Sequence, residues 1–156
     1  MHRIRVYVDT SVFGGTQDEE FAEVSRRFFA RVNNKGEYVI LLSAETLREL
    51  ADAPPPVQSI WQQIHPEAIE EVDINNEVNE LAQRYINAHV LEPASESDAL
   101  HVAAATVAGA DLILSWNFKH IVNFNRIRGF NSVNVNQGYR PMTILSPLEV
   151  VYDDEE

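Results

Sequence analysis

The 156-residue sequence contains no cysteine. This excludes a disulfide framework, a thiol nucleophile and a thiolate metal site, and it is typical of a reducing compartment, so we expect a cytoplasmic protein. No apolar run approaches the roughly 20 residues that a membrane-spanning helix needs, and we expect no membrane partner. Residues 1–6 lead directly into a predicted strand, and we expect no signal peptide.

Basic residues are also scarce, with 12 Lys and Arg against 24 Asp and Glu and a formal net charge of −12. This balance argues against tight binding to polyanions, because affinity for nucleic acids depends largely on neutralised phosphates. The late basic residues nevertheless gather in one segment, which predicts a local basic patch. They are Lys119, His120, Arg126, Arg128 and Arg140. Residues 153–156 are all acidic, and we expect a disordered tail beyond a single domain at 1–152.

Short apolar runs alternate with segments of helical periodicity. The predicted strands are 4–8, 38–42, 69–74, 111–115 and 142–145. The predicted helices are 19–32, 44–51, 57–64, 75–88, 99–110, 119 to about 125, and 147–151. Gly14-Gly15 and the Gly- and Asn-rich stretch 129–138 are predicted as loops. This alternation predicts an α/β protein, a three-layer α/β/α sandwich with a mainly parallel central sheet.

Acidic and amide side chains follow the predicted strands. Asp9 ends the first strand, and Glu45 and Glu49 lie in the two turns after the second. Asp98 opens the alanine-rich helix, and Asn117 follows the fourth strand. Because the carboxyl ends of parallel strands share one edge of a sheet, we expect these side chains to converge there.

Each of these residues also has a purely structural interpretation. Asp9 and Asn117 are good turn or cap residues, and the stretch 95–98 (Ser-Glu-Ser-Asp) resembles a capping box. Glu45 and Glu49 are spaced as on a solvated helix face. None of these interpretations explains why acids from distant segments should meet at one edge.

Carboxylates that share a cleft repel one another unless a cation compensates them. Mg²⁺ is the natural cation, since it prefers a few carboxylates with retained waters. Such an ion can polarise a phosphodiester and activate water. The acids therefore predict metal-dependent phosphoryl hydrolysis.

Four stretches together resemble the PIN domain family, especially its VapC-type toxins. They are 7–11 (YVDTS), 42–50 (LSAETLREL), 97–103 (SDALHVA) and 114–120 (LSWNFKH). The resemblance covers nearly the whole chain and implies a small α/β/α nuclease. It further implies a Mg²⁺- or Mn²⁺-dependent endoribonuclease acting on RNA, often a homodimer and often neutralised by a partner antitoxin.

The resemblance also implies which residues form the site. Asp9, Glu49 and Asp98 match the acidic metal positions, and Glu49 is preferred over Glu45 because the family pattern is Glu-Leu after the serine. The fourth acidic position is occupied by Asn117, which brings no charge, so we expect a second ion to bind more weakly there.

Four further residues are candidates for substrate contact. Ser11 and Ser115 are expected to help position the metal water and substrate, and Lys119 and His120 to contact a substrate phosphate. Thr10 is interpreted as a turn hydroxyl.

His101 is interpreted as a hydrogen-bonded core residue and Trp116 as a packing aromatic. Two other functions stay open. One is a PIN-fold binding module with weak or no catalysis, which the uncharged Asn117 favours. The other is an aspartyl-phosphate phosphatase or receiver domain with Asp9 as nucleophile, although Ser11 stands where a second acid is wanted.

Overall fold

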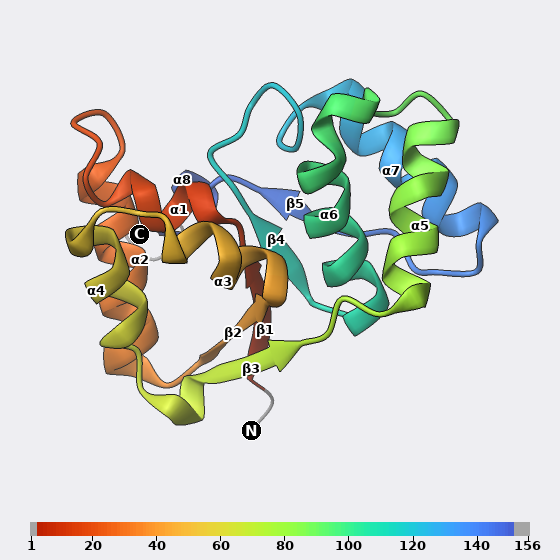
Figure 1. Cartoon of the computed structure of the whole chain (residues 1–156). Coiled ribbons are helices and arrows are strands. Elements are labelled where there is room, and N and C mark those ends of the chain that lie inside the picture. Colours follow the sequence, from red (N-terminus) through yellow and green to blue (C-terminus); the bar gives the residue numbers. More distant parts are fainter. Residues whose placement is uncertain (1–2, 152–156) are drawn as a thin grey trace.

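The apolar runs assigned to strands pair side by side in one sheet. In a computed structural model, which describes residues 3–151, the sheet has five strands in the order β3-β2-β1-β4-β5 (Figure 1). Every pair of neighbours is parallel. The strands are β1 (Ile4–Val8), β2 (Tyr38–Ser43), β3 (Ile69–Val72), β4 (Leu112–Leu114) and β5 (Ile144–Leu145). The central strand β1 places Val6 opposite Ile40 on one side and Leu112 on the other.

Helices connect the strands in the predicted alternation. They are α1 (Thr10–Gly15), α2 (Ala22–Lys35), α3 (Ala44–Ala51), α4 (Pro55–Gln62), α5 (Asn76–Asn87), α6 (Glu96–Ala108), α7 (Phe124–Asn136) and α8 (Pro147–Val151). Short 3₁₀ turns lie at η1 (Pro66–Ala68) and η2 (Pro93–Ser95). Ser43 caps α3, because its hydroxyl accepts a hydrogen bond from the backbone N–H of Thr46.

Two hydrophobic cores lie on opposite faces of the sheet. Val6 and Val8 of β1 point into a core built with α1, α2, α4 and α8. Tyr7, between them, points into the other core, which is built with α5, α6 and α7. This alternation follows from the two-residue period of a strand, and Figure 1 shows the two helix layers on either side of the sheet. The predicted three-layer sandwich is therefore confirmed.

Apart from shifted element ends, such as β5 beginning at Ile144 where a strand was predicted from 142, the secondary-structure prediction is wrong in three segments. Gly14 and Gly15 belong to helix α1. Residues 119–122 form turns, and the predicted helix from 119 to about 125 is replaced by α7, which begins only at Phe124. The stretch 129–138, predicted as a loop, lies mostly inside α7. There the asparagines make tertiary hydrogen bonds, including one from the Tyr85 hydroxyl to Asn134 Oδ1 at 2.5 Å.

The predicted acidic tail at 153–156 and the predicted domain end at residue 152 lie outside the described residues. Within residues 3–151, no helix is long and apolar enough to cross a membrane.

Candidate active site at the carboxyl edge of the sheet

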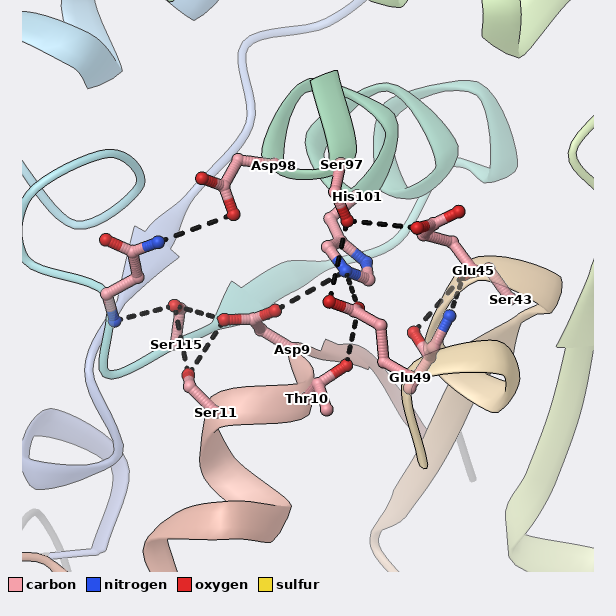
Figure 2. Close-up of polar contacts among 12 residues, drawn as sticks. Asp9, Thr10, Ser11, Ser43, Glu45, Glu49, Ser97, Asp98, His101 and Ser115 are labelled. Carbon is pink, nitrogen blue, oxygen red and sulfur yellow. Dashed lines mark hydrogen bonds and ion pairs between the residues drawn. The ribbon is translucent and has the colours of Figure 1, made fainter. Parts of the chain in front are cut away.

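The three predicted acids come from different segments and meet at the carboxyl edge of the sheet. Asp9 directly follows β1 and occupies the N-cap position of α1. Glu49 lies on α3 and Asp98 in the first turn of α6. Figure 2 shows the three side chains reaching toward the same region, with His101 beside Glu49 and Asp9. The predicted convergence is thus present in the structure.

Asp9 is held rigidly and is only 5% exposed. Its Oδ2 accepts hydrogen bonds from the hydroxyls of Ser11 at 2.8 Å and Ser115 at 2.7 Å. The two hydroxyls are themselves fixed, because they accept hydrogen bonds from the backbone N–H groups of Trp116 and Asn117. Both serines therefore orient Asp9, and a contact of theirs with substrate stays a prediction.

Glu49 is also hydrogen-bonded from several directions. Its Oε1 accepts from the Thr10 hydroxyl at 2.8 Å and lies 2.5 Å from Nε2 of His101. Burial raises the pKa of Glu49, but the hydrogen bonds from His101 and Thr10 outweigh burial and hold the pKa below its ordinary value. Thr10 thus does more than form a turn, because its hydroxyl orients an acid of the site. Glu49 is ionised at neutral pH.

Glu45, the other acid of α3, has different partners. It forms an ion pair with Arg48, and it accepts a hydrogen bond from the hydroxyl of Ser97 at 3.0 Å. The Ser97 hydroxyl lies 3.5 Å from Glu49 as well. Both glutamates face α6, so neither belongs to a fully solvated helix face.

His101 links the core to the site. As predicted it is buried and hydrogen-bonded: Nδ1 lies 2.7 Å from the Tyr7 hydroxyl, which lies 2.7 Å from Ser43 Oγ. Its Nε2 faces Glu49 and lies 3.7 Å from Asp9 Oδ1. Burial opposes protonation, but contacts with Tyr7, Glu49 and Asp9 outweigh it and raise the pKa of His101 well above 6.5. The imidazolium therefore donates to Glu49 and to Tyr7, a role in the site that spacing alone did not reveal.

Asp98 lies on the opposite side of the site from Glu49. Its Oδ2 is 2.9 Å from Nδ1 of His120, and its Oδ1 accepts a hydrogen bond of 3.4 Å from the side-chain amide of Asn117. Burial and the nearby charge of Asp9 raise the pKa of Asp98, against the opposing effect of His120. Burial is the larger of the two causes, and repulsion from the Asp9 carboxylate adds to it.

The structure contradicts the capping-box interpretation of Asp98 and confirms that Asn117 is a cap residue. Among the described residues, Ser95 makes no side-chain hydrogen bond as the cap of α6, so the proposed capping box is absent. Asn117 does cap a turn, because its Oδ1 accepts a hydrogen bond from the backbone N–H of His120 at 2.9 Å. The amide nitrogen of Asn117, and not its oxygen, therefore faces Asp98.

The loop that follows β4 is anchored by aromatic packing. Trp116 is buried as predicted, stacks on Phe21 with ring centroids 4.2 Å apart, and donates from Nε1 to the Ser25 hydroxyl at 2.8 Å. Gly15 permits this packing, since a Cβ there would lie 2.8 Å from the indole nitrogen. Lys119 is exposed on the same loop. The loop is thus rigid at Trp116 and presents a cation beyond it.

The site contains hard oxygen donors suited to a divalent cation. Within residues 3–151, no three acidic or histidine side chains are already arranged as a complete ligand set. Mg²⁺, however, is usually bound by one or two carboxylates with retained waters. Within the described residues Asp9 Oδ1 accepts no hydrogen bond and lies 3.7 Å from His101 Nε2, and burial together with the charge of Asp9 raises the pKa of Asp98. Asp9 and Asp98 are therefore the residues that could hold an ion, with Glu49 beside them.

Comparison with known proteins supports the fold. No family model and no curated sequence matches the chain. Among solved structures, a chain of VapBC2 from Rickettsia felis bound to a promoter DNA fragment has a TM-score of 0.59 at 12% identity. That match covers 92% of this chain and 98% of the other.

Two further structures give similar values. VapC20 from Mycobacterium tuberculosis, a sarcin-ricin loop cleaving toxin, has a TM-score of 0.54 at 15% identity, covering 72% of this chain and 92% of the other. DNA-bound VapBC from Salmonella typhimurium has a TM-score of 0.53 at 13% identity, covering 92% and 98%. At these identities the likeness concerns the fold, and the chain accordingly has the PIN-like α/β/α fold of the VapC toxins.

Proposed function

We propose that this protein is a metal-dependent endoribonuclease, the toxin of a toxin-antitoxin pair. The observation that carries the proposal is the convergence of Asp9, Glu49 and Asp98 at the carboxyl edge of a fully parallel sheet. The fold likeness to VapC20, a sarcin-ricin loop cleaving toxin, supports RNA as the substrate.

The ion would be Mg²⁺ or Mn²⁺, held by Asp9 and Asp98 with Glu49 beside them; when bound, it supplies polarisation of the phosphate and activation of water. The chain's own residues orient these acids. Ser11 and Ser115 fix Asp9, and Thr10 and His101 fix Glu49.

On the other side of the site, His120 and Asn117 hold the two carboxylate oxygens of Asp98. Lys119 is exposed on the same loop, where its ammonium can bind a substrate phosphate.

The test is cleavage of a mixed RNA pool by the wild type and by Asp98→Asn, purified in parallel, with Mg²⁺, with Mn²⁺ and with EDTA. We expect the wild type to cleave only with metal and the variant not to cleave. Calorimetric titration of Mn²⁺ should show binding that the variant loses. Equal cleavage by the two proteins, or wild-type cleavage that EDTA leaves unchanged, contradicts the proposal.

We further propose an antitoxin partner, a homodimeric assembly and a cytoplasmic location. Three of the similar structures are complexes of the VapBC or FitAB kind bound to DNA, which supports a protein partner. Light scattering after size-exclusion chromatography tests the dimer, since a mass of one chain, 17.7 kDa, excludes it. Inhibition of cleavage by the product of a neighbouring gene tests the antitoxin.

A catalytically weak binding module is the second candidate. Asn117 favours it, because this residue donates a hydrogen bond to Asp98 where a fourth carboxylate is expected. In that case the wild type should bind RNA without cleaving it, and Asn117→Asp should create cleavage. Robust cleavage by the wild type excludes this alternative.

A further inference from the structure

A polar hollow of about 530 Å³ lies where the end of α5 meets the beginning of α7. We call it the basic hollow. It is lined by Ala88, His89, Val90, Lys119, Asn123, Asn125, Arg126 and Gly129. None of these residues carries a carboxylate, although the protein as a whole has a formal net charge of −12. The hollow is thus a local exception to the acidity of the chain.

The two cations of the basic hollow are not neutralised by acids. Lys119 is exposed, and within residues 3–151 it makes no hydrogen bond or ion pair. Arg126 donates from Nη1 to the backbone carbonyl of Val90, which fixes the guanidinium but leaves its charge in place. His89 adds a third side chain that can donate hydrogen bonds. Cations and amides in one hollow are suited to the oxygens of phosphate groups.

The basic hollow is connected to the acidic site through the loop that follows β4. Lys119 precedes His120, whose ring contacts Asp98 at 2.9 Å. Lys119, which lines the hollow together with Arg126, therefore belongs to the same loop as a residue that contacts the acids. The predicted basic patch is only partly formed, because Arg140 lies near Gly109 at the amino end of β4.

An exposed aromatic side chain stands next to the hollow. Phe124, the first residue of α7, is 75% exposed, and the guanidinium of Arg128 lies 5.5 Å from its ring centroid. Arg128 also lines a second hollow, which shares Asn125 and Gly129 with the first. Single-stranded nucleic acids bind to cationic grooves in which bases stack on aromatic side chains.

We propose that the basic hollow binds the phosphate backbone of single-stranded RNA beside the cleaved bond, and that Phe124 stacks on one of its bases. This inference rests on the proposed ribonuclease function and assigns it a substrate-binding surface outside the acids.

Binding is measured apart from cleavage. The protein is Asp98→Asn in EDTA, and the probe is a fluorescein-labelled single-stranded RNA of about 12 nucleotides, within the range of known site sizes. Fluorescence anisotropy is recorded at several salt concentrations for Lys119→Ala and Phe124→Ala. Matched controls are Arg140→Ala, at the other edge of the sheet, and Val135→Ala, which removes another exposed apolar side chain of α7.

We expect Phe124→Ala to weaken binding by roughly 5- to 100-fold, the usual range for a stacked base. Lys119→Ala should weaken it and reduce the slope of log affinity against log salt by about 0.7, one phosphate contact on a single strand. Both controls should bind like their parent. Single-stranded DNA of the same sequence shows whether the 2′-hydroxyl contributes.

The proposal is overturned if the parent does not bind the RNA, if the two variants bind as the controls do, or if a poly-glutamate peptide displaces the RNA as well as unlabelled RNA does. The cleavage assay separates this inference from the proposed function. If the protein cleaves RNA while Lys119→Ala and Phe124→Ala bind it normally, only the RNA-binding role of the basic hollow is overturned. If the protein never cleaves RNA but binds it through Lys119 and Phe124, only the proposed ribonuclease function is overturned.

Discussion

Hydroxyl, imidazole and amide groups orient the acids of this site. Asp9 was predicted because it ends an apolar strand, but its carboxylate is fixed by Ser11 and by Ser115, which is 106 residues away in sequence. Thr10 and His101 hold Glu49 in the same manner across 39 and 52 residues. The acids could be predicted from their positions after strands. Their hydrogen-bond partners could not, because contacts over such separations leave no periodic signal.

Substitution of the two glutamates of α3 should separate their roles. Glu49→Gln removes the charge beside His101 and Asp9, and we expect RNA cleavage to fall by roughly 10- to 100-fold, as for residues that support a metal site. Glu45→Gln alters an ion pair with Arg48, whose side chain is 62% exposed, and should change cleavage by less than about 2-fold. Initial rates at saturating Mn²⁺ measure both. A larger loss of cleavage in Glu45→Gln than in Glu49→Gln would show that Glu45, and not Glu49, is the acid of the site.

The raised pKa of Asp98 has a consequence for stability. Burial and Asp9 disfavour the ionised form in the folded protein, so ionisation destabilises the fold once the pH exceeds the unfolded value near 3.8. In the absence of metal, Asp98→Asn should therefore raise the unfolding temperature at pH 7.5. The gain should disappear as the pH falls toward about 4, where the carboxyl is protonated in both states.

Thermal unfolding of both proteins in EDTA, followed by circular dichroism across this pH range, measures the effect of Asp98→Asn. A variant that is less stable at pH 7.5 would mean that the contact with His120 outweighs the repulsion from Asp9.

Among the elements, α7 departs most from expectation. Its glycine and asparagines are typical of loops, yet Asn134 is buried and accepts the Tyr85 hydroxyl, while Asn131 accepts from the backbone N–H of Met142 at 2.7 Å. Gly129 lies against Val90, where a Cβ would be 2.8 Å from a methyl carbon. Tertiary packing therefore overrides helix propensity, and a reading of local preference alone could not have found this helix.

Two glycines in helices offer a matched comparison. Gly129→Ala should destabilise the protein by roughly 1–2 kcal/mol, because overpacking against the stiff Val90 side chain exceeds the gain in helix propensity. Gly14→Ala, in α1, meets nothing within 4 Å and should stabilise the protein by about 0.5–1 kcal/mol. Urea denaturation measures both. Equal changes in the free energy of unfolding for the two variants would mean that α7 does not approach Val90 closely.

For the whole molecule, the alternation of apolar runs and helical segments was enough to predict the layers, because parallel strands need helices on both faces. The order of the strands could not be predicted in the same way. It depends on crossovers that place β4 beside β1, although more than 100 residues separate Val8 from Leu112. The sheet edge that bears the acids was therefore predicted, and the neighbours of each strand were not.

Metal binding should stabilise the whole domain. An ion that binds only the folded state at about 100 times its dissociation constant adds about 2.7 kcal/mol, which corresponds to a rise of roughly 5–10 °C in the unfolding temperature. Differential scanning fluorimetry with increasing Mn²⁺ should show a saturating rise for the wild type and a much smaller one for Asp98→Asn. A rise of equal size in both proteins would place the ion elsewhere.

The two cores on opposite faces of the sheet support different acids of the site. Glu49 is carried by α3, which packs into one core through Leu50, and Asp98 by α6, which packs into the other. The acids thus sit on a seam between two separately packed halves, joined by the sheet. His101 and Ser97 of α6 contact Glu49 and Glu45 of α3, so the two halves are joined at the acids themselves, and the geometry of the site depends on contacts between the cores as well as within them.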